Sequence, residues 1–231
     1  MKRTFISIFV LLIISIISIN TYAQQGKFKG TVKYTLAWEG EVPPGVPTSL
    51  EVKIYEEKSS FNNILSMFGE PTITNAEGKF SYSLFDFSQV PIEGVTGKWY
   101  IRTKLDEEEI KKNVYDVTSE TKLIAGKTAK KVNVTFNKED GTQTQETIWM
   151  CDEIGPSLDL VFYPGLKGMP FEFPVDADKF KIIFTVSEIT EGKIKEADML
   201  VPTGYEEQSQ EEFEEIIKII FEAIGGGGDD I

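Results

Sequence analysis

Alternation of apolar and polar residues with a period of two is the dominant pattern along this chain. It is clearest over 28–38, where Val32, Tyr34, Leu36 and Trp38 share one face and lysines and threonines occupy the other. Successive side chains of a strand point to opposite faces, so this pattern is typical of half-buried antiparallel strands. The alternation recurs over 50–54, 80–84, 99–102, 131–136, 144–150 and 180–186, and Gly192 begins a further short strand.

These segments predict a mainly β fold with roughly nine or ten strands in sequence order. The Asp140-Gly141 pair between two of the segments is a hairpin signal. The Pro- and Gly-rich stretch from Glu41 to Pro47 is interpreted as a long hairpin loop. We therefore expect an up-and-down meander that forms a curved antiparallel sheet, either a half-barrel or a closed barrel.

A first departure from this pattern lies at Ser59–Phe68. Phe61, Ile64, Leu65 and Phe68 are spaced there as on one face of a helix. The segment therefore predicts a short helix between two of the strands.

The second departure is an amphipathic helix over 209–224. Ser209 and Glu212 have the spacing of a capping box, and glutamates crowd the first turns, where the helix dipole favours them. Gly225 follows the last apolar residue and ends the helix. The apolar stripe consists of Phe213, Ile216, Ile217, Ile220 and Ile224. It either covers the open face of the sheet or binds a partner, and the acidic polar face argues against a membrane surface.

The first 23 residues have the organisation of a secretory signal peptide. Lys2 and Arg3 precede an apolar run over 5–19, and small residues then favour cleavage between Ala23 and Gln24. The apolar run is short for a membrane span, which needs roughly 20 residues. A retained N-terminal anchor is the alternative interpretation. We expect a periplasmic or secreted protein.

The chain divides into three expected parts: the signal peptide (1–23), one antiparallel β domain (24–205), and an acidic amphipathic helix with a Gly-rich tail (206–231). It carries 37 acidic and 24 basic residues and a net charge of −13 at pH 7. Loss of Lys2 and Arg3 with the signal peptide leaves a still more acidic protein. This charge repels nucleic acid and anionic lipid headgroups, and it favours solubility.

The residues that most enzymes rely on are scarce. The chain has no histidine, so imidazole bases, His metal ligands and His-dependent triads are excluded. Cys151 is the single cysteine, so it has neither a disulfide partner nor a histidine to activate it, and it is interpreted as a buried or half-buried structural thiol. No phosphate loop or metal-ligand spacing occurs. We expect no enzymatic activity, cofactor or metal; a carboxylate pair formed in space is the remaining route to catalysis.

The segment Phe162–Val175 is apolar although it is rich in proline and glycine. Its three prolines and two glycines argue against a regular helix, and its large apolar side chains distinguish it from a polar loop. An apolar loop must pack down or meet an apolar partner. It is therefore either a lid on the sheet edge or the mouth of a hydrophobic pocket, with Met169 as an adaptable lining residue.

Several short motifs along the chain resemble those of a known family. They are Gly30–Tyr34, Ile124–Lys131, Ile148–Trp149 with Asp152–Ile154, Gly168–Phe173 and Ala197–Tyr205. In this order they resemble exported proteins of Gram-negative bacteria that carry a domain of unknown function, and the GLPGLI proteins are similar. The resemblance covers most of residues 27–205.

The resemblance implies a curved antiparallel sheet similar to the lipoprotein-carrier half-barrels of the LolA type, in which a concave apolar face holds acyl chains. It implies no catalytic residues. The chain departs from the family pattern at Cys151 and in the added acidic helix, so the family's partner is not carried over.

We therefore expect an exported, non-enzymatic binding or carrier protein with an apolar cleft for a lipid, lipoprotein or other hydrophobic ligand. The predicted lining is Trp149, Phe162, Leu166, Met169, Phe171 and Phe173, with Ile216, Ile217 and Ile220 as a lid. The alternative is a structural or protein-interaction module of the cell envelope. In that case the helix fills the sheet face permanently, and the acidic surface binds an envelope protein.

Overall fold

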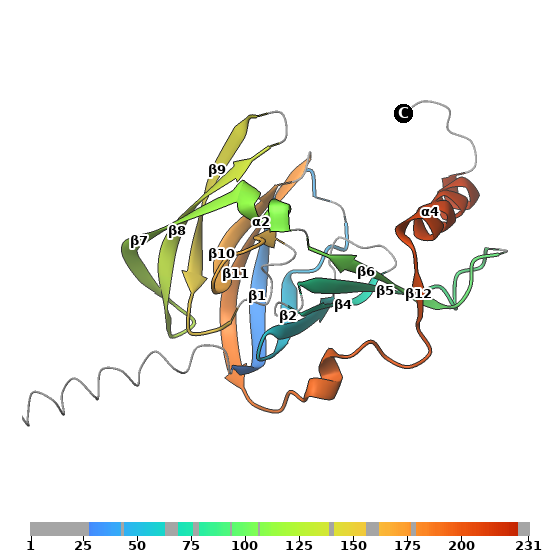
Figure 1. The fold of residues 1–231 in the computed structure, drawn as a ribbon, viewed down its shortest axis with the longest axis horizontal. Helices are drawn as coiled ribbons and strands as arrows, with labels where there is room; N and C mark the ends of the chain where they lie inside the picture. Colours follow the sequence, from blue (N-terminus) through green and yellow to red (C-terminus); the bar gives the residue numbers. More distant parts are fainter. Residues whose placement is uncertain are drawn as a thin grey trace, which may run out of the picture.

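The computed structural model describes residues 28–42, 44–62, 69–75, 79–92, 94–105, 107–138, 141–155, 162–176 and 179–225. These residues form a 12-stranded sheet that curves but does not close, with β12 and β7 as its two edges (Figure 1). The mainly β fold and the curved antiparallel sheet are therefore confirmed, in the open form and with more strands than expected. The predicted signal peptide lies outside the described residues.

The first half of the chain supplies one meander of antiparallel strands. Its strands are β1 (Lys29–Gly40), β2 (Ser49–Tyr55), β3 (Lys58–Asn62), β4 (Gly69–Asn75), β5 (Phe80–Asp86) and β6 (Lys98–Lys104). Each pairs with the next in sequence. A short helix, α2 (Glu107–Lys112), then leads to the far edge of the sheet.

The second half supplies another meander, which returns toward the first. Its strands are β7 (Asn113–Ile124), β8 (Lys127–Asn137), β9 (Gln143–Cys151), β10 (Met169–Asp176) and β11 (Phe180–Glu191). β11 pairs with β1 from Gly30↔Glu191 to Gly40↔Phe180, so the two meanders become one sheet. The chain ends with a 3₁₀ turn (Glu196–Met199), β12 (Glu206–Gln208), which is parallel to β6, and α4 (Gln210–Gly225).

Aromatic rings form the centre of the main core, where the two meanders meet. Tyr34 of β1 makes edge contacts with Phe173 of β10 and Phe184 of β11, at centroid distances of 5.9 and 6.1 Å. Phe173 and Phe184 stack at 4.6 Å. Edge-to-face and offset-stacked pairs are the geometries that the ring quadrupole favours. The Tyr34 hydroxyl donates a 2.6 Å hydrogen bond to the Pro170 carbonyl, so its buried polar atom is satisfied.

A second, smaller cluster lies under α4. Phe87, Val95 and Ile220 are buried there, and Phe213 of the helix contacts Phe85 of β5 at a ring distance of 4.3 Å. The predicted C-terminal helix and its packing against the sheet are therefore confirmed. It covers the β5–β6 end, away from the main core (Figure 1).

The predicted capping box of this helix is also present. The Ser209 N–H donates to Glu212 Oε2 at 2.9 Å, and the Glu212 N–H donates to Ser209 Oγ at 3.2 Å. Two N–H groups that the first turn leaves unpaired are thereby satisfied. The helix ends at Gly225, and the side chain of Ile224 lies outside the described residues.

The predicted helix at Ser59–Phe68 is wrong over its first residues. Lys58–Asn62 is strand β3, which pairs with β2 and β4, and residues 63–68 lie outside the described part. Ser59, Ser60 and Phe61 are all buried, so the strand loses the alternation that marks half-buried strands. The Ser59 and Thr74 hydroxyls satisfy each other at 2.6 Å, which makes the burial of polar residues on β3 acceptable.

The interpretation of Phe162–Val175 as a loop is wrong for its second half. From Met169 onward the chain is β10, an interior strand. Its prolines are tolerated because the register against β9 shifts between Pro170 and Glu172, and pairing with β9 ends at Glu172, before Pro174. The second half of this segment is therefore part of the sheet and not a lid on its edge.

Two predictions about turns have opposite outcomes. The β8–β9 hairpin around Gly141 is confirmed, with Asn137 paired to Gln143 and Gly141 at a φ of 81°. The strand expected from Gly192 is wrong. Gly192 has a φ of 92° and donates to the Lys29 carbonyl at 2.7 Å, so the chain turns out of the sheet after β11.

Replacing Tyr34 with phenylalanine tests the main core. The Y34F protein keeps the ring but leaves the Pro170 carbonyl without its donor, so we expect the free energy of unfolding to fall by about 1–3 kcal/mol. Urea unfolding of the two proteins measures the difference. Tyr82→Phe, on a partly exposed ring of β5, is the matched control and should change stability by less than about 0.5 kcal/mol. Equal losses in both variants would contradict the assignment.

Neighbouring isoleucines of α4 test the second cluster. Ile220 is buried and Ile219 is exposed. Ile220→Ala should weaken the docking of α4 by about 2 kcal/mol or more, since a buried side chain is truncated, whereas Ile219→Ala should be nearly neutral. Amide hydrogen exchange over 210–225 reports this directly, with protection falling more than tenfold only in I220A. The same loss in I219A would contradict this assignment, because alanine has the higher helix propensity and truncating an exposed side chain removes little packing.

Candidate functional site

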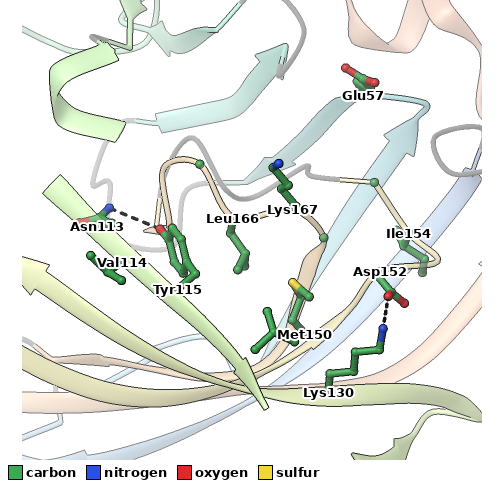
Figure 2. A pocket seen from close by; sticks show the side chains of 14 residues that line it. Glu57, Asn113, Val114, Tyr115, Lys130, Met150, Asp152, Ile154, Leu166 and Lys167 are labelled. Atoms are coloured by element: carbon green, nitrogen blue, oxygen red, sulfur yellow. Dashed lines mark hydrogen bonds and ion pairs between the residues drawn. The ribbon is translucent and has the colours of Figure 1, made fainter. Parts of the chain in front are cut away.

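A cavity of about 820 Å³ lies between β7, β9 and the loop that precedes β10 (Figure 2). One part of its wall is apolar: Val114, Tyr115, Val117, Met150, Ile154 and Leu166. The remaining side chains are polar or charged: Glu57, Asn113, Lys130, Asp152 and Lys167. Gly155, Gly165 and Gly168 complete the lining.

The register of the sheet explains the apolar wall. Tyr115 and Val117 of β7 pair with Val134 and Val132, which are fully buried, so all four side chains share the core face of the sheet. β7 is an edge strand, and this leaves Val117 48% exposed. Val114 pairs with Thr135 and belongs to the opposite face by alternation. The cavity is therefore open to water at Val117.

Two glycines let the loop before β10 pass close to its neighbours. A Cβ at Gly165, where φ is 91°, would lie 2.6 Å from Cγ2 of Ile110 in α2. A Cβ at Gly168 would lie 2.7 Å from the Cys151 carbonyl oxygen on β9. Side chains are excluded at both positions, and the close fit holds Leu166 between them in the cavity wall.

Hydrogen bonds tie the same loop to β7. The Tyr115 hydroxyl donates to the Pro164 carbonyl at 3.0 Å, and Asn113 Nδ2 donates to the Tyr115 hydroxyl oxygen at 3.4 Å. The Leu166 N–H donates to the Tyr163 carbonyl at 3.0 Å and closes a turn. The wall is therefore built from both sides by ordered residues.

Charged groups mark the other end of the cavity. Lys130 Nζ lies 2.5 Å from Asp152 Oδ2, and Figure 2 shows this pair at the opposite end from Asn113 and Tyr115, with Met150 and Leu166 between. Lys167 is exposed and adds a second positive charge to the lining. The cavity thus presents an apolar stretch that ends at an ion pair, the arrangement suited to an amphiphilic molecule.

A half-buried carboxyl group lies on β9, outside the cavity lining. Burial raises the pKa of Glu146 above its usual value of 4.5, and a hydrogen bond with the Tyr163 hydroxyl opposes that shift. Burial also raises the pKa of Tyr163, whose hydroxyl donates to the Pro174 carbonyl at 3.3 Å. The pair therefore joins β9 to the loop and to β10.

Cys151 is buried, as expected for a structural thiol. Burial raises its pKa above 9.0, and hydrogen bonds to the backbone at Glu153 and Ile154 lower it by less. The thiol form therefore prevails at neutral pH, and the group is a poor nucleophile.

The structure places most of the predicted lining in the core. Leu166 does line the cavity. Met169, Phe171 and Phe173 of β10 are fully buried in the main core. Phe162 is partly buried and packs against the Phe173 and Phe184 rings at 5.4 and 5.6 Å.

The other predicted site residues lie elsewhere. Trp149 follows Ile148 and precedes Met150 on β9, so it points to the opposite face, where Lys122 Nζ lies 4.3 Å from its ring centre. Ile216, Ile217 and Ile220 belong to the cluster under α4 with Phe87. The helix is therefore not a lid on this cavity.

Sequence reasoning missed the wall supplied by β7. Tyr115 and Val117 do alternate with polar residues, but the segment follows an acidic run and carries few apolar residues. Met150 lay in a predicted strand, yet nothing in the sequence showed that its side chain, although buried, would line a cavity beside Leu166.

Comparison with protein-family models and with curated proteins finds no match to this chain. Within the described ranges, no helix has the length and apolar character needed to cross a membrane. The same residues contain no group of three or more His, Cys, Asp or Glu side chains placed to hold a metal ion.

The Glu146 carboxyl predicts a pH effect on stability. Its folded-state pKa is raised, so above about pH 4.5 the folded protein binds more protons than the unfolded chain, and stability falls as pH rises. Glu146→Gln removes this term. We expect the variant to gain stability relative to the wild type between pH 4 and 7 in urea unfolding series. Glu51→Gln, exposed on β2, removes the same charge and is the control. A difference that does not grow with pH would contradict the argument.

Proposed function

We propose that this protein is an exported, non-enzymatic binding or carrier protein whose cavity takes the apolar part of a lipid, lipoprotein or other hydrophobic ligand. The observation that carries the proposal is the apolar wall of Met150, Leu166 and Val117: the first two are buried, and the wall opens to water at the half-exposed Val117. The volume of about 820 Å³ lies within the range of small-molecule sites. Covering this wall with a ligand removes apolar surface from water, which is favourable.

The lining also indicates how such a ligand would be oriented. An acyl chain beside Met150 and Leu166 gains about 0.8 kcal/mol for each CH₂ that leaves water. A polar headgroup would then lie at the Lys130–Asp152 pair or at Lys167. The binding energy comes from burial, and the charged groups set the direction in which the ligand enters.

Two further features support the proposal. The curved, open sheet is the architecture that the resemblance to GLPGLI proteins and LolA-type carriers implies. The sequence of residues 1–23 supports export to the periplasm or the medium.

An interaction module of the cell envelope is the second candidate, and a specific observation favours it. The chain fills much of its own core face, since Met169, Phe171 and Phe173 leave no space there. Native mass spectrometry of the protein from its own cells separates the candidates. A co-purifying lipid or acylated peptide supports the carrier, and a clean apo mass supports the module.

A valine of the cavity wall tests the proposal, with dansyl-undecanoic acid as a fluorescent probe. Val117→Asn makes the apolar wall polar without adding charge at a half-exposed position, so folding should be retained. The loss of burial, about 1.5–3 kcal/mol, should raise the Kd for the probe roughly tenfold or more.

Val42→Asn is the matched control, because Val42 is an exposed valine outside the cavity lining. It should bind the probe like the wild type. Equal affinity in all three folded proteins, or no uptake by the wild type at micromolar concentrations, would overturn the assignment of this cavity.

A further inference from the structure

The strand β7 is one of the two edges of the sheet in the described part of the chain. Among the described strands it pairs with β8 alone, and it runs for 12 residues, whereas the other edge, β12, has three. Val114, Val117 and Leu123 of β7 are three of the six exposed large hydrophobic residues in the described chain, and Leu123 is 76% exposed. Soluble proteins usually protect such edges with short strands, charges, prolines or bulges; β7 has charges and a bulge, but it is long and contains no proline.

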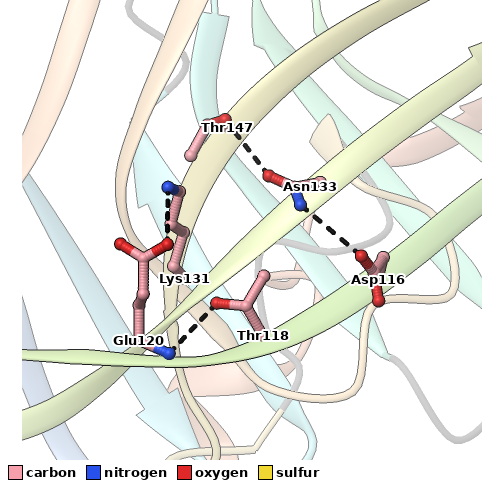
Figure 3. Close-up of polar contacts among 6 residues, drawn as sticks. All are labelled: Asp116, Thr118, Glu120, Lys131, Asn133 and Thr147. Carbon is pink, nitrogen blue, oxygen red and sulfur yellow. Dashed lines mark hydrogen bonds and ion pairs between the residues drawn. The ribbon is translucent and has the colours of Figure 1, made fainter.

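A bulge divides this edge into two equal parts. The register against β8 shifts between Val117 and Thr121, so regular pairing covers the residues before and after the bulge. The Glu120 N–H donates to Thr118 Oγ1 at 3.2 Å, and Glu120 Oε1 binds Lys131 Nζ at 2.9 Å (Figure 3). The central amide is therefore used within the chain, and Val114–Val117 and Thr121–Ile124 remain as two regular segments symmetric about Ser119.

We infer that a second copy of this chain docks on this edge, β7 against β7 in antiparallel orientation, with the two-fold axis at Ser119. An axis normal to the sheet keeps the core faces of both copies on the same side, so each residue meets one of matching face. The pairs across the interface are Val114 with Ile124, Tyr115 with Leu123, Asp116 with Lys122, and Val117 with Thr121. Two of these four pairs are apolar on both sides, and a third joins an acid to a base.

Charge selects this register over its neighbours. An axis at Thr118 would place Asp116 opposite Glu120, and an axis at Glu120 would place that residue opposite its own copy. Like charges directly opposite each other are destabilising. With the axis at Ser119, no acidic residue of β7 faces another.

The contribution of Lys122 is to specificity more than to affinity. Its ammonium already lies 2.7 Å from Glu172 Oε1 and over the Trp149 ring, while Asp116 Oδ2 accepts from Asn133 Nδ2 at 3.5 Å (Figure 3). Attraction across the interface therefore adds little to pairs that are already satisfied. Affinity comes from the backbone ladder and from burial of Leu123 and the valines.

Docking would also complete the wall of the cavity. Leu123 of the second copy would lie opposite Tyr115, which lines the cavity next to the open side at Val117. The inference does not rest on the proposed function, since the edge pairs without any ligand. A net charge of −13 on each copy opposes association, so the test belongs at 0.15 M salt, where charges more than about 8 Å apart are screened.

Cysteine cross-linking at the axis is the first test. In protein purified from the producing cells, Ser119→Cys places two thiols next to each other across the axis, within disulfide reach of paired strands. Mild oxidation should give a covalent dimer as the main species on non-reducing gels. Ser187→Cys, exposed on the interior strand β11, is the matched control and should stay monomeric. The native Cys151 is buried and does not interfere.

The mass of the wild-type protein in solution is the second test. Light scattering during gel filtration at about 100 μM should give twice the chain mass, a concentration at which a Kd in the micromolar range is saturated. Leu123→Lys should be monomeric and folded, and Leu200→Lys, at another exposed leucine, should remain a dimer. A monomeric wild type, or a dimer that S119C does not cross-link, would overturn the inference, and neither outcome decides whether the cavity binds the probe.

Discussion

The pairing of β1 with β11 is the interaction on which the rest of the structure depends. Each half of the chain forms a meander in which every strand pairs with its neighbour in sequence. The ladder from Gly30↔Glu191 to Gly40↔Phe180 joins them and brings Tyr34 to a carbonyl 136 residues away. Closing so long a loop costs chain entropy, which the buried aromatic contacts at the junction must offset.

The candidate site is a consequence of how the second meander is arranged around that junction. β7 lies at the far edge because α2 carries the chain there before the hairpins return toward β1. The loop before β10 then packs between α2 and β9, where Gly165 and Gly168 allow an approach that a side chain would block. The cavity is what remains between this tightly fitted loop and an edge strand with no outer neighbour among the described residues.

The apolar residues of the chain serve two separate purposes. Most are used to hold the sheet together, including the aromatic rings of β10 and the isoleucine stripe of α4. A smaller group on β7, namely Val114, Val117 and Leu123, stays accessible to water. Stability is supplied by the first group, so binding of a ligand or a second copy can use the second group without competing with the core.

The sequence by itself determined the local structure. Alternation identified the half-buried strands, Ser209 and Glu212 located the start of α4, and the absence of histidine removed most catalytic chemistry. These signals act over a few residues, so they depend little on distant contacts. They failed where burial was two-sided, as at Ser59–Phe61 of β3, and where a bulge admitted proline, as at Pro170 of β10.

Only the tertiary structure decided which apolar side chains are covered. Phe171 and Val117 are both apolar residues in predicted or alternating segments, yet Phe171 is buried in the core and Val117 is half exposed at the cavity. The same holds for the apolar stripe of α4: its sequence suggests a lid on the cleft, but it packs against β5 and β6 together with Phe87. Strand order sets these outcomes, because exposure depends on which neighbours a strand receives, and residues more than a hundred positions apart supply those neighbours.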